Sequence, residues 1–294
     1  KDEPFIFSLE LADELIKKEM ALFKQEHLEP YTKTKHELRQ IELQNIKTML
    51  NGYNTKSPLN QKVEEVEMTL FISMSPEQVL SSTEEVIRKY FHHETIKFSS
   101  FILSSFAVMR NLFMQQENFL LIDIGGEMTY IVMVKKNVLS DSISFPMGRH
   151  FIIRGIAESL SCTQGEAESY VSLLNDGHAE DSTEKKLGPI IEKLKKEWLT
   201  NFQESLANLS RDISVPYVIY LSTDNDFMNF FGQAIEAEQF NQYTLTESKF
   251  KIIFLNNEAL HGLVEFEKDA MRDPFISVDS AYINHFLIYK AVAE

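Results

Sequence analysis

The first third of the chain alternates apolar and polar residues in a way that predicts a compact α+β unit. Residues 8–28 place apolar side chains at close to helical spacing, which predicts a helix that ends before Pro30. Residues 66–74 alternate between apolar and polar side chains, a pattern typical of a strand with one buried face. A second helix is expected to follow at once, with Ser75 as its N-cap and Pro76 in its first helical position.

The middle of the chain predicts a helix over residues 100–114 and then a β-meander. Residues 119–124 (FLLIDI) form a continuous apolar run broken by one acid, which predicts a strand buried on both faces. The two glycines at 125–126 predict a tight turn, and two more strands are expected over residues 129–134 and 138–145.

The second half of the chain is predicted to be mostly helical, with two further buried strands. Thr163 and Glu166 have the spacing of a capping box, which predicts a helix start, and a polar loop is expected over residues 175–183. A long amphipathic helix follows, and the apolar stripe around Trp198 is expected to pack into a core rather than to bind a cofactor. The remaining elements are strands expected at residues 215–221 and 250–255, and helices expected at residues 226–237 and 277–293.

Composition indicates an ordinary globular protein and narrows the range of its partners. The 294 residues carry 29 basic and 44 acidic side chains, a formal net charge of −15, and 44% of them are hydrophobic. This length suggests about two domains. The negative charge argues against a general nucleic-acid binder and against direct attraction to anionic lipid. The single cysteine, Cys162, excludes an intramolecular disulfide and favours a reducing cytosol. No apolar run approaches the roughly 18 residues that a membrane-spanning helix needs.

The segment from Asp123 to Thr129 carries the clearest candidate chemistry. An aspartate at the end of a buried strand is costly unless it binds something, and two glycines let backbone N–H groups approach an anion closely. We therefore expect Asp123 to hold Mg²⁺ through water. Gly125, Gly126 and Thr129 would contact the phosphates of the same ligand. A plain β-turn, with Asp123 bonded to local backbone, explains the same spacing and occurs more often.

Several motifs follow one another within residues 120–171. They are a strand that ends in Asp123 and the two glycines, a β-meander, the turn Pro146-Met147-Gly148, and a helix containing Glu166-Ala167-Glu168. In this order and spacing they resemble the central region of the bacterial actin-like proteins of the FtsA/PilM type. The resemblance implies an α/β, actin-like (ribonuclease H-like) fold. Residues 41–74 are similar to the α+β subdomain that this type inserts, and residues 273–282 are similar to its closing segment.

The resemblance also implies a domain organisation. Residues 1–97 are expected to form the inserted α+β (SHS2-like) subdomain, and residues 98–118 and 274–294 the remainder of the first actin-like domain. Residues 119–273 are expected to form the second actin-like domain. Its fourth subdomain is expected to be reduced to a short helical insertion at about residues 175–212.

The chain departs from the resemblance where a nucleotide would bind. The first phosphate loop of these proteins precedes the inserted subdomain, and no segment of this chain, which begins at Lys1, matches it. Glu127 follows the two glycines, where a carboxylate would repel a triphosphate. The adenosine loop corresponds to Leu221–Asp226, which includes Ser222, Thr223 and Asp224, has no glycine and adds two acids. We therefore expect ATP and Mg²⁺ not to bind tightly and ATPase activity to be weak or absent.

Two functional hypotheses follow. The first is a cytoplasmic scaffold or adaptor that recruits proteins of a membrane-associated machine, for cell division or for type IV pili, through residues 1–97. It could self-associate, and it would reach the inner face of the membrane through a protein partner, without binding nucleic acid. The alternative is an ATP-binding, polymer-forming actin homologue whose N-terminal phosphate loop is missing from this chain. A third interpretation, an unrelated α/β protein with a Gly-Gly hairpin, requires that the strands around residues 119–145 and 215–255 lie in different sheets.

Overall fold

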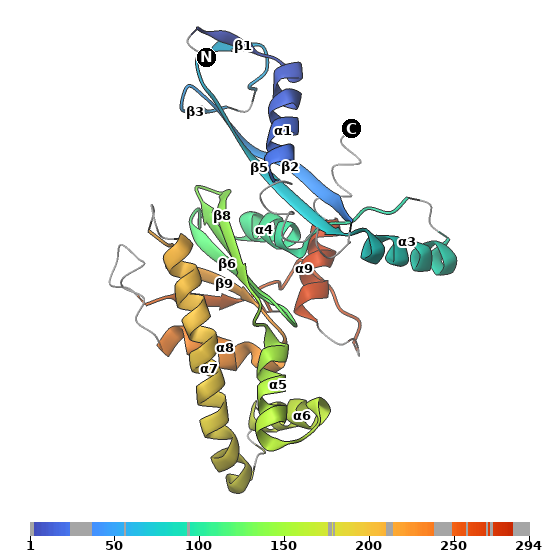
Figure 1. The fold of residues 1–294 in the computed structure, drawn as a ribbon, viewed down its shortest axis with the longest axis vertical. Helices are drawn as coiled ribbons and strands as arrows, with labels where there is room; N and C mark the ends of the chain where they lie inside the picture. The colour runs from blue at the N-terminus through green and yellow to red at the C-terminus, as the bar shows by residue number, and fades with distance from the viewer. Residues whose placement is uncertain are drawn as a thin grey trace. The chain divides into compact units, whose positions relative to one another are not determined.

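A computed structural model of the 294-residue chain consists of two compact units, Lys1–Ser100 (unit 1) and Phe101–Glu294 (unit 2). Figure 1 shows the elements of both units. The structure describes residues 3–23, 37–55, 57–92, 95–175, 178, 180–209, 214–237, 249–256, 258–268, 270 and 273–284.

Two long antiparallel strands form the frame of unit 1. β2 (Leu38–Leu50) pairs along most of its length with β5 (Val66–Pro76), and β3 (Tyr53–Asn54) pairs with the end of β2. A small second sheet joins β1 (Phe5–Phe7) to β4 (Gln61–Val63), and the described residues of the unit include the helices α1 (Leu9–Phe23) and α3 (Glu77–Phe91). The strand predicted over residues 66–74 is confirmed. The helix predicted over residues 8–28 is confirmed as far as Phe23, and its last five residues lie outside the described ranges.

The start of α3 differs from the prediction. Ser75, the predicted N-cap, lies in β5 and pairs with Arg39 of β2, while Pro76 takes the N-cap position without a side-chain hydrogen bond. The helix therefore begins at Glu77. The strand runs on to Pro76 because β2 offers backbone partners as far as Leu38, so sheet pairing overrides the capping preference of serine.

Unit 1 has a small core and one buried carboxylate. The core cluster contains Phe7, Ala12, Leu50 and Val63. Glu42 on β2 is only 8% exposed, and its carboxylate accepts hydrogen bonds from the hydroxyls of Ser73, Ser99 and Ser100 at 2.7, 2.5 and 2.7 Å. Because Ser99 and Ser100 are the last residues of the unit, these bonds tie its end to its sheet.

A five-stranded mixed sheet organises unit 2, in the order β10-β9-β6-β7-β8. The antiparallel meander consists of β6 (Phe119–Ile124), β7 (Thr129–Lys135) and β8 (Val138–Phe145). β9 (Val218–Ser222) runs parallel to β6, and β10 (Lys251–Phe254) runs parallel to β9. The five predicted strands are confirmed to within a few residues. Because they share one sheet, the interpretation as an unrelated hairpin protein is wrong.

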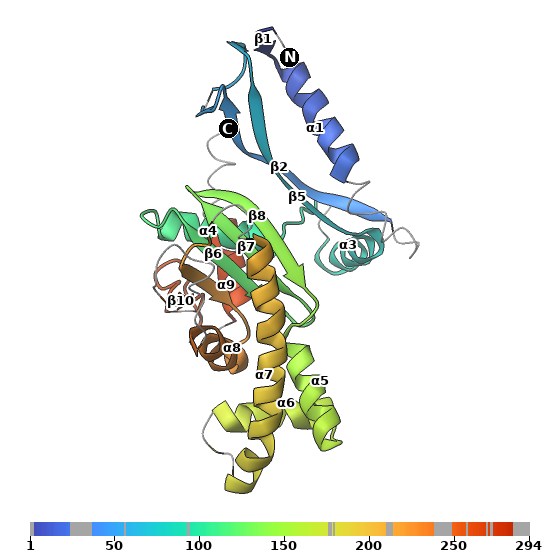
Figure 2. The same cartoon turned by 60° about the vertical axis from the view of Figure 1, so that its left-hand side comes forward.

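Helices cover both faces of this sheet. On one face, Leu120, Ile122 and Ile124 of β6 join a core with α5 (Arg149–Leu160), α6 (Gln164–Asn175), α7 (Asp181–Leu209) and α8 (Asn225–Ala237). On the other face, Phe119 and Tyr220 pack edge to face toward α4 (Phe101–Leu112) and α9 (Pro274–Tyr282). Figures 1 and 2 show α7 on one side of the sheet, with α4 and α9 on the opposite side. Since β-strand side chains alternate, Asp123 shares the face of Phe119.

The helix boundaries confirm some predictions and correct others. The capping box is confirmed, because the Thr163 N–H and hydroxyl both donate to Glu166 Oε2 at 2.8 Å and the Glu166 N–H donates back to the Thr163 hydroxyl at 3.3 Å. The loop predicted over residues 175–183 is too long, since α7 already begins at Asp181. The closing helix begins at Pro274, capped by Asp273, and residues 285–294 lie outside the described ranges. In the part of the chain that the structure describes, no helix is long and apolar enough to cross a membrane.

Trp198 is at the centre of the unit 2 core, as the apolar stripe predicts. It is fully buried and stacks on Phe202 at 5.1 Å between ring centroids, with Phe231 at 4.9 Å and Phe145 at 5.8 Å. Its indole N–H donates to the Met147 carbonyl at 3.2 Å. The ring therefore joins α7 to α8 and to the segment that leads into α5.

We expect Trp198→Ala to lower the free energy of unfolding by about 3–5 kcal/mol, because it removes these ring contacts and leaves a cavity. Trp198→Phe keeps most of the ring volume and loses the indole hydrogen bond, so a smaller loss of about 1–2 kcal/mol is expected. Urea unfolding followed by circular dichroism measures both values. Equal losses in the two variants would contradict a packing role for the ring.

Candidate functional site

The Gly125-Gly126 turn joins β6 to β7, as predicted, and the Gly125 N–H closes it by donating to the Met128 carbonyl at 3.0 Å. Neither glycine has a positive φ, so backbone freedom does not explain them. A Cβ on Gly125 would meet only the Met128 carbonyl, at 3.7 Å, and a Cβ on Gly126 would lie 2.9 Å from the His150 ring. A Cβ on Gly148 would overlap the carbonyls of both turn glycines. Gly148 is therefore the position where glycine is required, because α5 begins directly against the turn.

The first N–H groups around the start of α5 bind the carbonyl oxygens of this turn. The N–H groups of Gly148, Arg149 and His150 donate to the carbonyls of Glu127, Gly125 and Gly126 at 3.1, 2.9 and 2.8 Å. Free N–H groups at a helix start are the groups that commonly bind phosphate. Here the turn satisfies these three donors, so they are occupied within the chain.

Glu127, the acid expected to repel a triphosphate, is matched by two basic side chains of α5. Arg154 donates to both carboxylate oxygens at 2.8 Å, and His150 Nδ1 lies 3.1 Å from Oε1. The hydrogen bonds from Arg154, with a smaller contribution from His150, lower the pKa of Glu127 to about 2. The same bond raises the pKa of Arg154. A phosphate group would have to compete with this carboxylate for Arg154.

The predicted adenosine loop lies between the end of β9 and the start of α8. Ser222 and Thr223 are buried, and the Thr223 hydroxyl has no hydrogen-bond partner among the described residues. Asp224 forms an ion pair with Arg149, the first residue of α5. Both loops that the resemblance assigns to a nucleotide are therefore tied to the same helix.

Asp123 is partly buried at the end of β6, beside the neighbouring strand β9. Its carboxylate accepts a hydrogen bond from the Ser222 hydroxyl at 3.3 Å. Burial, reinforced by the like charge of Asp279 on α9, raises the pKa of Asp123 to about 7 although the Ser222 bond lowers it. Asp279 accepts a hydrogen bond from the Ser104 hydroxyl at 2.8 Å, and burial raises its pKa as well.

Thr129, predicted to contact phosphate, is fully buried beside Trp198. Its hydroxyl donates to the Met147 carbonyl at 2.8 Å and accepts from the Trp198 indole at 3.3 Å. The hydroxyl therefore holds the end of the meander against the core.

These residues fit a closed junction better than a cradle for Mg-ATP. The Gly125 N–H and the Thr129 hydroxyl are bonded within the chain, and burial disfavours the charged form of Asp123 that a cation would bind. Within the described ranges, no group of three or more His, Cys, Asp or Glu side chains is arranged to hold a metal ion. The contacts predicted for Asp123, Gly125, Gly126 and Thr129 stay predictions, and this arrangement does not favour them.

Sequence reasoning missed four residues of this region: Arg149, His150, Arg154 and Asp279. The first three follow Gly148 closely, and placing Gly148 against the turn would have indicated that basic side chains lie near Glu127. Asp279 comes from a distant helix, and no local pattern connects it to Asp123.

Comparison with known proteins identifies the fold. No protein-family model matches the chain, and no curated protein matches its sequence. The structure of the PilM-PilN type IV pilus biogenesis complex matches 96% of this chain and 75% of the other at a TM-score of 0.61 and 13% identity. Weaker matches are MreB 5 of Spiroplasma citri bound to AMPPNP (TM-score 0.40, 12% identity, 74% and 67% of the two chains) and the ethanolamine utilization protein EutJ from Carboxydothermus hydrogenoformans (0.37, 15%, 54% and 55%). The chain has an actin-like fold like that of PilM, which confirms the predicted fold class.

We expect Gly148→Ala to lower the free energy of unfolding by about 1–3 kcal/mol, because the added Cβ meets two backbone carbonyls that cannot rotate away. Gly165→Ala in α6 is the matched control. Its Cβ meets nothing within 4 Å, so this helix substitution should raise stability by about 0.5–1 kcal/mol. Thermal denaturation of the two variants measures the contrast. A Gly148→Ala protein as stable as the wild type would contradict the close approach of α5 to the turn.

The raised pKa of Asp123 predicts a pH dependence of stability. Between about pH 4 and pH 7 the folded state binds a proton at Asp123 that the unfolded state does not, so stability should rise as pH falls through this window. Asp123→Asn removes the titrating group. The variant should be more stable than the wild type at about pH 8, by on the order of 1–3 kcal/mol, and the difference should shrink toward pH 4.

Urea midpoints of the two proteins at several pH values measure this difference. Asp279→Asn should reduce it, because the substitution removes the neighbouring like charge. A stability difference between the wild type and Asp123→Asn that does not change with pH would contradict the raised pKa of Asp123.

Proposed function

We propose that this chain is an actin-like scaffold of type IV pilus biogenesis that acts by binding proteins rather than by turning over nucleotide. The observation that carries the proposal is the likeness to PilM, which spans 96% of this chain and 75% of that one. PilM was solved as a complex with PilN, so we propose a partner of the PilN kind. The likeness favours pilus assembly over cell division, the other machine that the sequence suggested.

The candidate site supports weak nucleotide binding. A triphosphate needs free hydrogen-bond donors and balancing positive charge. Three N–H groups around the start of α5 already bind the turn, and Arg154 and Arg149 already bind Glu127 and Asp224. A nucleotide would have to break these contacts before it gained any of its own. We therefore propose that ATP and Mg²⁺ do not bind tightly.

The alternative, an ATP-binding and polymer-forming homologue, has one observation in its favour. The buried hydroxyl of Thr223 has no hydrogen-bond partner within the described residues, and a buried polar group in that state is costly. A bound ligand at the end of β9 would supply the missing hydrogen bond.

We assign the partner contact to unit 1, within the predicted subdomain of residues 1–97. This unit exposes large apolar side chains on several elements, among them Ile6 at 62%, Leu9 at 59% and Tyr53 at 79%. A contiguous exposed apolar patch marks an interaction site, and we propose that these side chains contribute to one. In this proposal the protein is cytoplasmic and reaches the inner face of the membrane through its partner. Residues 98–118 and 274–294 would complete the first actin-like domain, with residues 119–273 as the second.

Isothermal titration calorimetry with the PilN homologue of the same organism tests the proposal. We expect saturable binding with a Kd in the micromolar range, which corresponds to a binding free energy of about −8 kcal/mol. Ile6→Asp in unit 1 should weaken it at least about tenfold, and Ile276→Asp, an equally exposed residue on α9, is the matched control and should leave it unchanged.

The same instrument tests the nucleotide part of the proposal. Mg-ATP should bind with a Kd above about 0.1 mM, and Asp123→Ala should leave this Kd unchanged. Absence of PilN binding, together with tight Mg-ATP binding that is lost in Asp123→Ala, would overturn the scaffold in favour of the alternative.

A further inference from the structure

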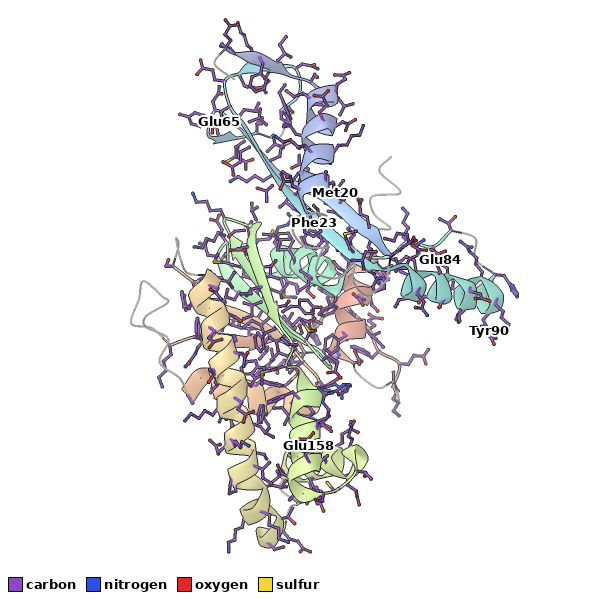
Figure 3. The ribbon with its side chains drawn as sticks, viewed as in Figure 1. Met20, Phe23, Glu65, Glu84, Tyr90 and Glu158 are labelled. Carbon is purple, nitrogen blue, oxygen red and sulfur yellow. The ribbon has the colours of Figure 1, made fainter. Side chains whose placement is uncertain are left out.

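The outer face of α3 carries an apolar stripe that remains exposed to solvent. Val79, Val86 and Tyr90 are 56%, 52% and 66% exposed, and Thr83 lies between them on the same face. The Thr83 hydroxyl donates to the Val79 carbonyl at 2.8 Å, so it is satisfied within the helix. A different face of α3 packs against β5, where Leu80 is buried. Figure 3 shows Tyr90 at the outer end of the helix.

The spacing of the stripe makes it complementary to itself. Its four residues follow at steps of four, three and four, which is the spacing of a coiled-coil seam. This spacing is symmetric about a point between residues 84 and 85. An antiparallel second copy would therefore place Val79 opposite Tyr90 and Thr83 opposite Val86, each pair occurring twice. The large ring meets a small side chain in both outer layers, as a two-fold contact requires.

The polar residues beside the stripe agree with the same arrangement. Gln78, Ser82, Glu85 and Lys89 line one flank of α3. In an antiparallel pair this flank faces the same flank of the second copy, where Lys89 lies between Gln78 and Ser82 and Glu85 lies close to Ser82. Each of these pairs joins a donor to an acceptor. Glu85 lies nearest the two-fold axis and therefore also faces Glu85 of the second copy. The repulsion between these two like charges opposes association.

The charges on the remaining side of α3 are already matched within unit 1. Arg39 lies 2.7 Å from Glu84 and 3.2 Å from Glu77, and Arg88 lies 3.2 Å from Glu84. These carboxylates therefore add little repulsion to a helix that approaches the stripe.

We propose that two copies of this chain associate through their α3 helices, packed antiparallel along the stripe of Val79, Thr83, Val86 and Tyr90. A four-residue seam on a 15-residue helix buries less than the roughly 800 Å² per partner of a standard interface, so the association is weak and depends on concentration. The inference is independent of the proposed partner and of the nucleotide site.

Sedimentation equilibrium of the 294-residue chain over a wide concentration range tests the association. We expect a monomer–dimer equilibrium, and Val86→Ser or Val79→Ser should weaken it at least about tenfold, because each substitution acts twice in a symmetric pair. Leu9→Ser is the matched control, since Leu9 on α1 is 59% exposed, and it should leave the equilibrium unchanged. Glu85→Gln should strengthen the dimer about two- to fivefold, because it removes the central like charges.

Disulfide trapping tests the antiparallel register. Two chains are made in a Cys162→Ser background, one with Thr83→Cys and one with Val86→Cys, and are mixed under mild oxidation. The mixed disulfide should form in excess of either symmetric one, because Thr83 faces Val86 across the seam. A chain that stays monomeric at every concentration overturns the proposal and leaves the stripe to a different protein. A dimer that Val86→Ser does not weaken, or that Glu85→Gln weakens, also overturns it.

Discussion

The contact between the start of α5 and the Gly125-Gly126 turn is the constraint on which the rest of unit 2 depends. Three backbone N–H groups of one segment meet three carbonyls of the other, and the approach is so close that Gly148 cannot carry a Cβ. This contact fixes the direction of α5. It thereby places Arg149 against Asp224 and Arg154 against Glu127. Further along α5, Gly155 leaves room for Leu194, so α7 can pack closely in turn.

The charge distribution of unit 2 follows from this geometry. The chain has a net charge of −15, yet the two acids nearest the turn and the β9–α8 loop are matched by basic residues of α5. Asp123 and Asp279, on the other face of the sheet, have only hydroxyl partners in the described hydrogen bonds and share a like-charge repulsion. Packing residues keep the actin-like fold in place, and the residues that meet a ligand can change independently of them.

The sequence predicted the elements whose pattern is local and strong. The run FLLIDI required burial on both faces, and the sheet buries it between two layers of helices. The prediction of a capping box at Thr163 and Glu166 was correct because such a box depends only on residues three apart. Ser75 was assigned wrongly because strand pairing with Arg39, more than thirty residues earlier, decides where α3 starts.

The turn that carries the candidate site was predicted from the sequence, and the contacts of its side chains were not. Asp123 and the two glycines lie where the pattern placed them. The sign of the charge on Glu127 was evident, but its partners Arg154 and His150 depend on how α5 packs against the turn, which no spacing in the sequence specifies. Asp279 approaches Asp123 only through the tertiary fold. Long-range pairings of this kind lie beyond single-sequence patterns.

The position of Trp198 has a practical consequence, because it is the only tryptophan in the chain. Its indole N–H binds the carbonyl of Met147, the residue before Gly148, so the ring is coupled directly to the junction between the turn and α5. Indole emission responds to the polarity and hydrogen bonding around the ring. The intrinsic fluorescence of the unmodified protein is therefore an optical readout of this junction, and it reports opening or ligand entry without an added dye.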